Sequence, residues 1–305
     1  MKKPFRGSRD TDAKLSMLHD YLKHYSIALQ DQGFARLYID AFAGTGSKTE
    51  TRPALPLFGP EFAEPHEVNT PGSARLALSV EPPFDTLVFI EQDQDRFHEL
   101  ERLASEYPDH KIFLKNGDAN QNVKRLCSGV PWHKRQGDVL GMRGVIFLDP
   151  FGMEVEWSTV EAVAATEALD CWYFFPLSGL YRNAPHDRAK LERGKEEKLD
   201  RLLGTTDWRE RWYQHSVLPE NMFESETEAV RRADVDAIEA YVSERLASVF
   251  KGGVMPPVRL RHNNNAPMAS LFFAVANPSP KATALAKRIA SYILKPGSSS
   301  HTRSR

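Results

Sequence analysis

The stretch Tyr38-Ile39-Asp40-Ala41-Phe42-Ala43-Gly44-Thr45-Gly46 carries the clearest fold signal in this chain. It joins an apolar run over residues 35–39, which predicts a buried strand, to a turn of small residues. Because Gly44 and Gly46 lack side chains, backbone there can approach a ligand at the carboxyl edge of a parallel sheet. Asp40 can accept a hydrogen bond from an ammonium group, directly or through water. A plain strand-to-helix turn with a capping acid is the alternative.

Two well-known classes of glycine loop fit this stretch poorly. A phosphate-binding P-loop requires G-x-x-x-x-G-K-[ST], whereas the chain reads Gly44-Thr45-Gly46-Ser47-Lys48-Thr49, with the lysine at the wrong spacing. A dinucleotide-binding turn requires a third glycine and a helix that begins at once, and the sequence predicts neither. The turn therefore belongs to neither class.

Apolar runs and helical patterns alternate along the first part of the chain. Apolar runs predict strands over residues 35–39, 86–90, 111–115, 144–148 and 171–175. Amphipathic patterns between them predict helices, and an earlier helix is expected over 12–29 with Asp12 as its cap. Residues 52–71 are expected to form a proline-rich loop. This alternation is typical of an α/β fold with a mainly parallel sheet and crossover helices.

The pattern changes after residue 183. Residues 183–250 are rich in Lys, Arg, Glu and Trp and predict a helical insertion. Strands over 258–261 and 270–275 and a helix over 281–294 are expected beyond it. We therefore predict five parts: an N-terminal helical extension (1–30), a Rossmann-like core (31–182), the helical insertion (183–250), strands and a helix that complete the core (251–295), and a disordered tail (296–305).

Three further predicted strands end in or just before an acid. Glu91 follows the second strand and can accept both hydroxyls of a ribose. Asp118 follows the third and can accept an adenine amine, cap the next helix, or do both. Asp149 follows the fourth, and Pro150 makes its loop stiff. Each acid alone is explained by an ordinary turn or cap, but their repetition after Asp40 favours one binding edge.

Composition excludes several classes of function. The chain has 40 basic and 41 acidic residues, so only a local basic face could bind nucleic-acid phosphates. Its two cysteines, Cys127 and Cys171, form neither a zinc motif nor a disulfide framework, and scattered histidines predict no metal site. The sequence shows no signal peptide and no run that could span a bilayer, so we expect a soluble cytoplasmic protein.

Together these motifs resemble the class I S-adenosylmethionine (SAM)-dependent methyltransferases. Residues 40–46 resemble their first motif, in the D-x-F-x-G-x-G form common among amino-group methyltransferases. Glu91 matches the ribose-binding acid and Asp118 the adenine-contacting acid. The resemblance implies a Rossmann-like fold with an antiparallel last strand, SAM as cofactor, and a cofactor site formed by Asp40, Phe42, Ala43, Gly44, Gly46, Glu91, Gln92, Asp118 and Ala119.

More narrowly, the chain resembles the three-Cys-motif partner (TcmP) protein family over about residues 12–185. The match rests on Lys14, Leu18, Tyr21-Leu22, Tyr25, the glycine turn, Gly72-Ser73, Phe89-Ile90-Glu91, Asp118-Ala119-Asn120, Leu148-Asp149-Pro150-Phe151-Gly152, Trp157, Pro176 and Arg182. The family is named for a genomic association with a separate three-cysteine protein. The resemblance therefore makes such a protein a candidate partner.

Residues Asp149-Pro150-Phe151-Gly152 occupy the position of the [DN]-P-P-[YF] catalytic loop of these enzymes. The second proline is absent, as in the tRNA guanine-N2 dimethyltransferases, which also resemble D-P-F-G here. The resemblance implies methyl transfer to an exocyclic amine of a nucleic-acid base. In that reading, Asp149 and the Pro150 carbonyl accept the N–H bonds of the amine and Phe151 stacks on the base.

Several alternatives stay open. The chain can be a methyltransferase acting on protein or a small molecule, a catalytically silent SAM-binding partner subunit, or another nucleotide enzyme. Arg182, Arg188 and Lys190 can face phosphates, although alternating charges after them favour a solvated helix. The run Trp172–Pro176 is interpreted as core more readily than as a base-stacking surface.

Overall fold

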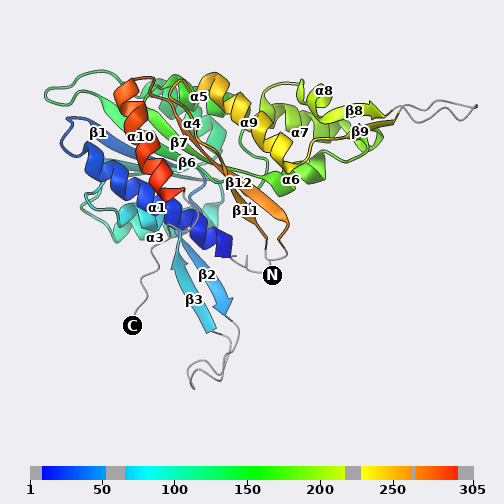
Figure 1. The fold of residues 1–305 in the computed structure, drawn as a ribbon. Coiled ribbons are helices and arrows are strands. Elements are labelled where there is room, and N and C mark those ends of the chain that lie inside the picture. Colours follow the sequence, from blue (N-terminus) through cyan, green and yellow to red (C-terminus); the bar gives the residue numbers. More distant parts are fainter. Residues whose placement is uncertain (1–8, 53–65, 217–227, 263–264, 295–305) are drawn as a thin grey trace, which may run out of the picture. The chain divides into compact units, whose positions relative to one another are not determined.

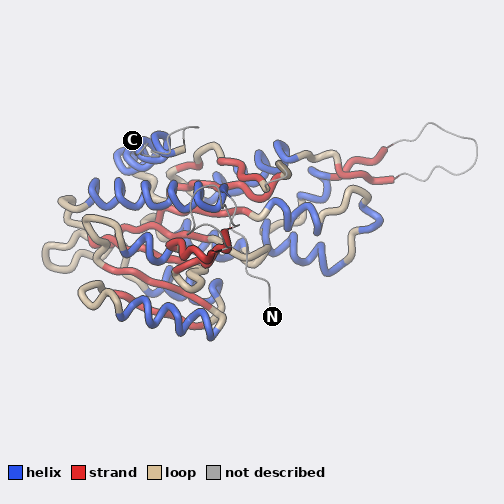
Figure 2. Tube along the Cα trace, turned by 90° about the horizontal axis from the view of Figure 1, so that it is seen from below, coloured by secondary structure: helices blue, strands red, loops and turns tan. Residues whose placement is uncertain are grey.

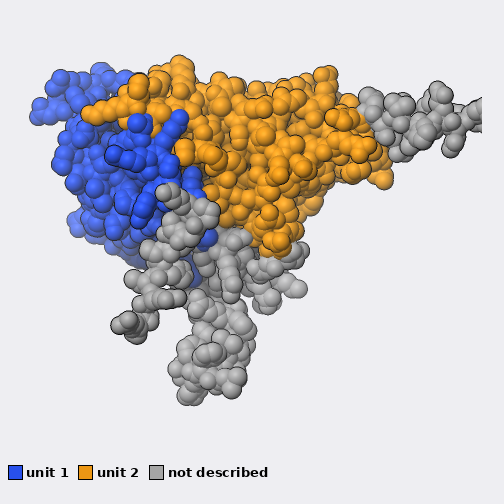
Figure 3. Space-filling view, in the orientation of Figure 1, with its two compact units in different colours: residues 1–122, 131–147, 284–305 blue, residues 123–130, 148–283 orange. Residues whose placement is uncertain are grey.

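The computed structural model describes residues 9–52, 66–216, 228–262 and 265–294 of the 305-residue chain. Two compact units are distinguished in Figure 3. The first draws on residues up to 122, on 131–147 and on residues from 284 onward, and the second on 123–130 and 148–283. The domain boundaries expected at residues 30, 182, 250 and 295 stay predictions.

Among its described residues, the first unit contains four parallel strands, β1 (Ala35–Asp40), β4 (Thr86–Glu91), β5 (Ile112–Asn116) and β6 (Met142–Leu148). Their spatial order is β6-β1-β4-β5, so the first strand along the chain lies between the fourth and the second. This is the 3-2-1-4 part of the strand order 3-2-1-4-5-6 of a doubly wound nucleotide-binding sheet. The buried apolar runs of β1 and β4 explain their central positions, because a central parallel strand is covered on both faces.

Three helices of the first unit are α1 (Arg9–Leu29), α2 (Ser73–Leu78) and α3 (Gln94–Ser105). In Figure 1, α1 is drawn in dark blue. Helix α1 begins at Arg9, so the expectation that Asp12 caps it is wrong: no proline or glycine stops the helix in residues 9–11. Helix α3 is capped by Asp93, whose carboxylate accepts the backbone N–H of Asp95 and Arg96 at 3.1 Å each.

A β-hairpin separates the glycine turn from α2. Strands β2 (Ser47–Arg52) and β3 (His66–Pro71) pair antiparallel where the sequence predicted only a proline-rich loop from residue 52. The Gly72 N–H donates to the Gly46 carbonyl at 2.9 Å and so closes the excursion at its base. The prolines of this stretch lie outside the paired residues except for Pro71, and residues 53–65 lie outside the described chain. Helix α2 thus starts beside the end of the glycine turn.

Antiparallel pairing characterises the strands of the second unit. Four of its strands belong to one sheet: β7 (Leu169–Phe175), β10 (Gly253–Val254), β11 (Val258–Arg261) and β12 (Pro267–Val275). Strand β12 runs antiparallel to β7, and it also pairs antiparallel with β10 and β11. The antiparallel last strand expected from the resemblance is therefore confirmed. Trp172 and Phe273 are buried with their rings 5.0 Å apart, which confirms the core interpretation of the aromatic run.

The rest of the second unit is mainly helical, as predicted. Its elements are α5 (Trp157–Ala165), α6 (Leu177–Asn183), the 3₁₀ helix η3 (Arg188–Lys190), α7 (Arg193–Leu203), α8 (Trp208–Trp212), β8 (Tyr213–Ser216), β9 (Glu228–Arg231) and α9 (Val235–Val249). Strands β8 and β9 form an antiparallel ribbon (Figure 2) that the sequence did not predict. Its four-residue strands are too short to give a clear alternation.

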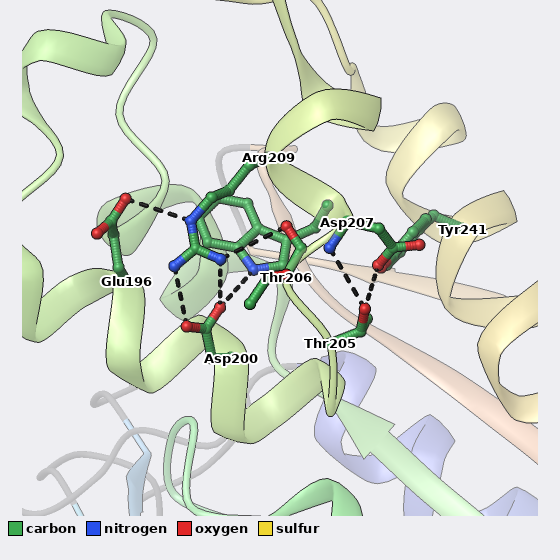
Figure 4. Close-up of polar contacts among 8 residues, drawn as sticks. Glu196, Asp200, Thr205, Thr206, Asp207, Arg209 and Tyr241 are labelled. Atoms are coloured by element: carbon green, nitrogen blue, oxygen red, sulfur yellow. Dashed lines mark hydrogen bonds and ion pairs between the residues drawn. The ribbon is translucent and has the colours of Figure 1, made fainter.

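A polar cluster fixes the helices of this segment to one another (Figure 4). Asp200 on α7 accepts two hydrogen bonds from Arg209 and one from the buried Trp208 indole, each 2.9 Å long. Asp207 accepts the Tyr241 hydroxyl at 2.6 Å and so joins α8 to α9. Since these groups satisfy one another, we assign the cluster a structural role.

The remaining helices are α4 (Ala119–Gly129) and α10 (Pro280–Ile293). Within the described residues, no helix is long and apolar enough to cross a membrane. The same residues contain no group of three or more His, Cys, Asp or Glu side chains placed to hold a metal ion.

Candidate cofactor site

Backbone hydrogen bonds hold the glycine turn across the carboxyl ends of the first unit's strands. The Ala41 N–H donates to the Phe147 carbonyl of β6 at 3.1 Å, and the Ala43 N–H donates to the Ile90 carbonyl of β4 at 3.0 Å. The register explains this, because Asp40 lies opposite Phe89 on one side and Phe147 on the other. The turn is therefore fixed to both neighbours of its own strand.

Asp40 is fully buried at the start of this turn. Its Oδ1 accepts the Phe42 N–H at 3.3 Å, and the Tyr38 hydroxyl donates to Oδ2 at 3.4 Å. In this structure Asp40 organises the turn from within, so the predicted contact with an ammonium group requires a water or a shift of the turn. The supporting hydroxyl of Tyr38 had no signal in the sequence beyond its place in the strand.

Glu91 joins three segments at the end of β4. Its Oε2 accepts the Gly44 N–H at 2.9 Å, and its Oε1 accepts the Asp93 N–H at 2.8 Å. Its backbone carbonyl accepts the Gly117 N–H at 3.0 Å. The side chain of Glu91 is largely buried, yet each carboxylate oxygen keeps a second lone pair that can accept a hydroxyl. The sequence identified this acid but not its bond to the glycine turn.

The two glycines of the turn serve different purposes. Gly44 has φ +63°, and a Cβ there would meet no atom of the described residues within 4 Å. Gly46 has φ +72°, and a Cβ there would lie 2.3 Å from Cδ2 of Leu103 on α3. Gly46 is therefore needed for packing, whereas Gly44 leaves open space beside the backbone.

Asp118 lies at the N-terminus of α4 and is half-buried. Its Oδ1 accepts the Gln121 N–H at 2.8 Å, which confirms the predicted capping role. A carboxylate retains further acceptor positions while capping, so the adenine contact stays compatible. Of the other predicted cofactor residues, Gln92 is exposed, Ala119 is buried and Phe42 is half-buried.

The hydrogen bonds of the turn reveal what kind of ligand it suits. The N–H groups of Phe42, Ala43 and Gly44 are all donated within the protein. A phosphate-binding turn instead leaves such N–H groups free to point at the anion. Two buried carboxylates at the base of this turn also repel an anion. The donor set therefore disfavours a pyrophosphate and fits a ligand with hydroxyl donors and positive charge.

The predicted catalytic residues belong to the second unit and directly follow β6 in the chain. Asp149 is half-buried, Pro150 is buried, and Phe151 is 65% exposed. The structure thus presents Phe151 at the surface of its own unit.

The thiols of the second unit are poor nucleophiles. Burial raises the pKa of Cys127 to about 12, and burial, aided by the neighbouring Asp170, also raises the pKa of Cys171. Both are free cysteines that stay protonated near neutral pH.

The strand order, the glycine turn after the first strand and the antiparallel last strand together define a Rossmann-like α/β fold of the class I methyltransferase type, as the sequence predicted. No protein-family model and no curated protein matches the chain.

The solved structures that are distantly similar to the chain include the following three. Protein LPL1258 from Legionella pneumophila is 13% identical, with a TM-score of 0.49 over 93% of each chain. The putative methyltransferase YhhF from Escherichia coli is 13% identical, with a TM-score of 0.31 over 52% of this chain and 69% of that one. The N-terminal domain of EvdMO1, crystallised in the presence of SAH and D-fucose, is 11% identical, with a TM-score of 0.39 over 85% and 82%. The fold class rests on strand order rather than on these similarities.

Proposed function

We propose that this chain binds SAM at the glycine turn and transfers its methyl group to an exocyclic amine of a nucleic-acid base. The observation that carries the proposal is the turn itself, whose amide donors are used internally while two buried carboxylates, Asp40 and Glu91, lie at its base. SAM bears a sulfonium and an ammonium against one carboxylate, so its net charge suits such a site better than a pyrophosphate does.

Each residue of the site contacts a different part of SAM. Glu91 accepts the ribose hydroxyls on its remaining lone pairs, and Asp118 accepts the adenine amine while capping α4. Open space beside Gly44 admits the ligand against the backbone. Asp40 holds the turn in shape and meets the ammonium group through water.

The acceptor residues follow from their place in the chain. Phe147 accepts a hydrogen bond from the glycine turn, and Asp149 is two residues farther along, which spans at most about 7 Å. SAM supplies an electrophilic methyl group, so the protein mainly has to position a nucleophile in line with it. Asp149 and the Pro150 carbonyl accept the N–H bonds of the amine and stabilise its developing positive charge. The exposed ring of Phe151 stacks on an unpaired base.

We also propose that the chain belongs to the TcmP family and that a separate three-cysteine protein is its partner. The residues quoted for that resemblance support the proposal. A cytoplasmic location is proposed with it.

The test has two stages, SAM binding and methyl transfer. Calorimetric titration of the full chain with SAM is followed by labelled-methyl transfer to tRNA, rRNA, DNA and lysate protein. Failure to bind SAM refutes the proposal altogether. Binding without transfer favours a silent SAM-binding subunit, and transfer to protein alone favours the other acceptor class.

The substitution Asp149→Ala isolates the catalytic role. We expect it to abolish methyl transfer while leaving SAM affinity within about twofold, because its partner is the acceptor amine. Glu154→Gln is the matched control, since it removes an exposed charge from the same loop. Retention of transfer in Asp149→Ala would contradict the assigned role.

A further inference from the structure

Cations in the helical part of the second unit fall into two groups. On α7, Arg193 pairs with Glu197 at 3.0 Å, as a solvated helix does. On α8, Arg209 and Arg211 likewise pair with acids, at 2.9 Å and 2.7 Å for their shortest bonds. By contrast, Arg182, Arg188, Arg231 and Arg232 form no ion pair with any residue that the structure describes.

Contacts among α6, η3 and β9 bring several of these unpaired arginines together. The Arg231 guanidinium lies over the Tyr181 ring of α6, 4.4 Å from its centroid. The backbone N–H of Arg231 donates to the His186 carbonyl at 2.7 Å, and Asp187 forms a β-bridge with Val230. Arg188 on η3 is next to that bridge. Figure 1 shows α6 and the β8–β9 ribbon in the same part of the second unit.

Tyr213 lies beside this group, and its hydroxyl donates to the Pro185 carbonyl at 2.7 Å. Although burial raises the pKa of the Tyr213 hydroxyl, first Arg231 and then Arg188 act to lower it. The backbone contacts that join residues 186–187 to residues 230–231 account for this, because they bring Arg188 and Arg231 to the same place. Arg182 is exposed and follows Tyr181 on α6, so it is grouped with these two as the arginine cluster, defined as Arg182, Arg188 and Arg231.

Nearby acids do not neutralise the arginine cluster. Asp187 faces Lys190 at 3.6 Å and also caps η3, and Asp234 caps α9 by accepting the Ala237 N–H at 2.9 Å. Among the described residues, the Arg231 guanidinium donates from Nη1 to the Ala233 carbonyl at 2.7 Å, whereas its buried Nε has no hydrogen-bond partner. A protein with net charge −1 thus keeps a local excess of arginine that its own carboxylates leave unused.

We infer that the arginine cluster binds the phosphate backbone of a single-stranded nucleic acid, with the half-buried ring of Tyr181 beside it. Guanidinium groups bind phosphates in a bidentate manner, and an aromatic side chain among them is typical of surfaces that hold single strands by charge and stacking. The small number of unpaired arginines and the near-neutral chain argue against tight binding of a duplex. The inference rests on the proposed function, because it assigns the surface that holds the acceptor strand.

The experiment measures binding of the full chain to a labelled single-stranded RNA of about 12 nucleotides by fluorescence anisotropy across a salt series. The test variant is Arg182→Gln with Arg188→Gln, since neither side chain forms a hydrogen bond or ion pair with a described residue that the change would break. The matched control is Arg193→Gln with Arg211→Gln, which removes two exposed but paired cations. Thermal unfolding midpoints confirm that both variants are folded.

Loss of two single-strand phosphate contacts lowers the slope of log K against log salt by about 1.4 and weakens binding at ~0.1 M salt by about 25-fold. The control should bind like wild type. An unchanged slope in the test variant, or an equal loss in the control, overturns the inference. Tighter binding of duplex DNA or of an acidic peptide overturns it as well, whereas single-stranded DNA binding as well as RNA supports it.

This outcome is separable from that of the proposed function. If the chain binds RNA through these arginines but never transfers a methyl group, the proposed function is refuted and the arginine cluster is supported as a binding site. Methyl transfer to RNA with an unchanged salt slope in the test variant would remove only the arginine cluster.

Discussion

Substitution of each glycine in the turn by alanine should separate packing from ligand access. Both residues have φ near +65°, and placing an L residue in that region costs about 1–2 kcal/mol. At Gly44 nothing is added to this, because a Cβ would meet no described atom within 4 Å. At Gly46 the Cβ would overlap Leu103, a buried side chain, and such overpacking costs a further ~1–3 kcal/mol.

We therefore expect Gly46→Ala to lower the free energy of unfolding by about 2–5 kcal/mol and Gly44→Ala by about 1–2 kcal/mol. Urea unfolding at 25 °C, followed by tryptophan fluorescence, measures both values. A Leu103→Ala background provides the internal test. The overlap is absent in that background, so Gly46→Ala should lower the free energy of unfolding only by the backbone cost of about 1–2 kcal/mol. The coupling free energy between the Gly46 and Leu103 substitutions is then about 1–3 kcal/mol.

The ligand provides the second readout. Gly44→Ala should weaken SAM binding by at least about tenfold, since each 1.4 kcal/mol of lost contact corresponds to that factor. Calorimetric titration of the folded variant measures it. If Gly44→Ala destabilises the protein as much as Gly46→Ala does, or if it binds SAM like wild type, the assignment of separate purposes to the two glycines is wrong.

Three more predictions concern carboxylates that accept hydrogen bonds. Glu91→Gln leaves one oxygen for two backbone N–H donors, so it should lower the free energy of unfolding by about 1–3 kcal/mol and weaken SAM binding, measured by urea unfolding and calorimetry. Asp200→Ala leaves the buried Trp208 indole without its acceptor and leaves Arg209 with Glu196 as its acid, so it should cost about 1–3 kcal/mol, against less than about 1 kcal/mol for loss of an exposed ion pair such as that of Arg193. Burial raises the pKa of Asp207, but hydrogen bonds from Thr205 and Tyr241 outweigh this and lower it below its usual value. The stability this contributes is present above the unfolded pKa of about 4 and is lost as pH falls through the lower folded pKa, so unfolding measured from pH 5 to pH 2 should show a shallower loss in Asp207→Asn.

The parallel strands were predictable because each is a continuous apolar run. Strands over 35–39 and 86–90 differ from β1 and β4 by one terminal residue. Burial on both faces leaves such runs without polar interruptions, which makes them easy to find. The β2–β3 hairpin was not predictable from Ser47–Arg52, since its strand is polar and carries no apolar alternation.

The residues of the candidate site were predictable from the sequence, but the hydrogen bonds between them were not. Asp40, Glu91 and Asp118 follow strands, so topology places them at one edge. That Glu91 accepts the Gly44 N–H depends on how two loops fold over the edge, and residues 47 positions apart give no local sign of such a bond. The predicted cap at Asp12 failed for the opposite reason: local cap chemistry was present, but the helix extended beyond it.

The hydrogen bond between Gly72 and Gly46 makes the β2–β3 hairpin a detachable insert. Its entry and exit are adjacent, so a hairpin of different length, or a short linker in its place, leaves the geometry of the glycine turn and of α2 intact. Closing a loop of twice the length adds only about 0.6 kcal/mol. Evolution can therefore vary this insert, and an engineer can graft a reporter peptide into it, next to the cofactor loop and without rebuilding the fold.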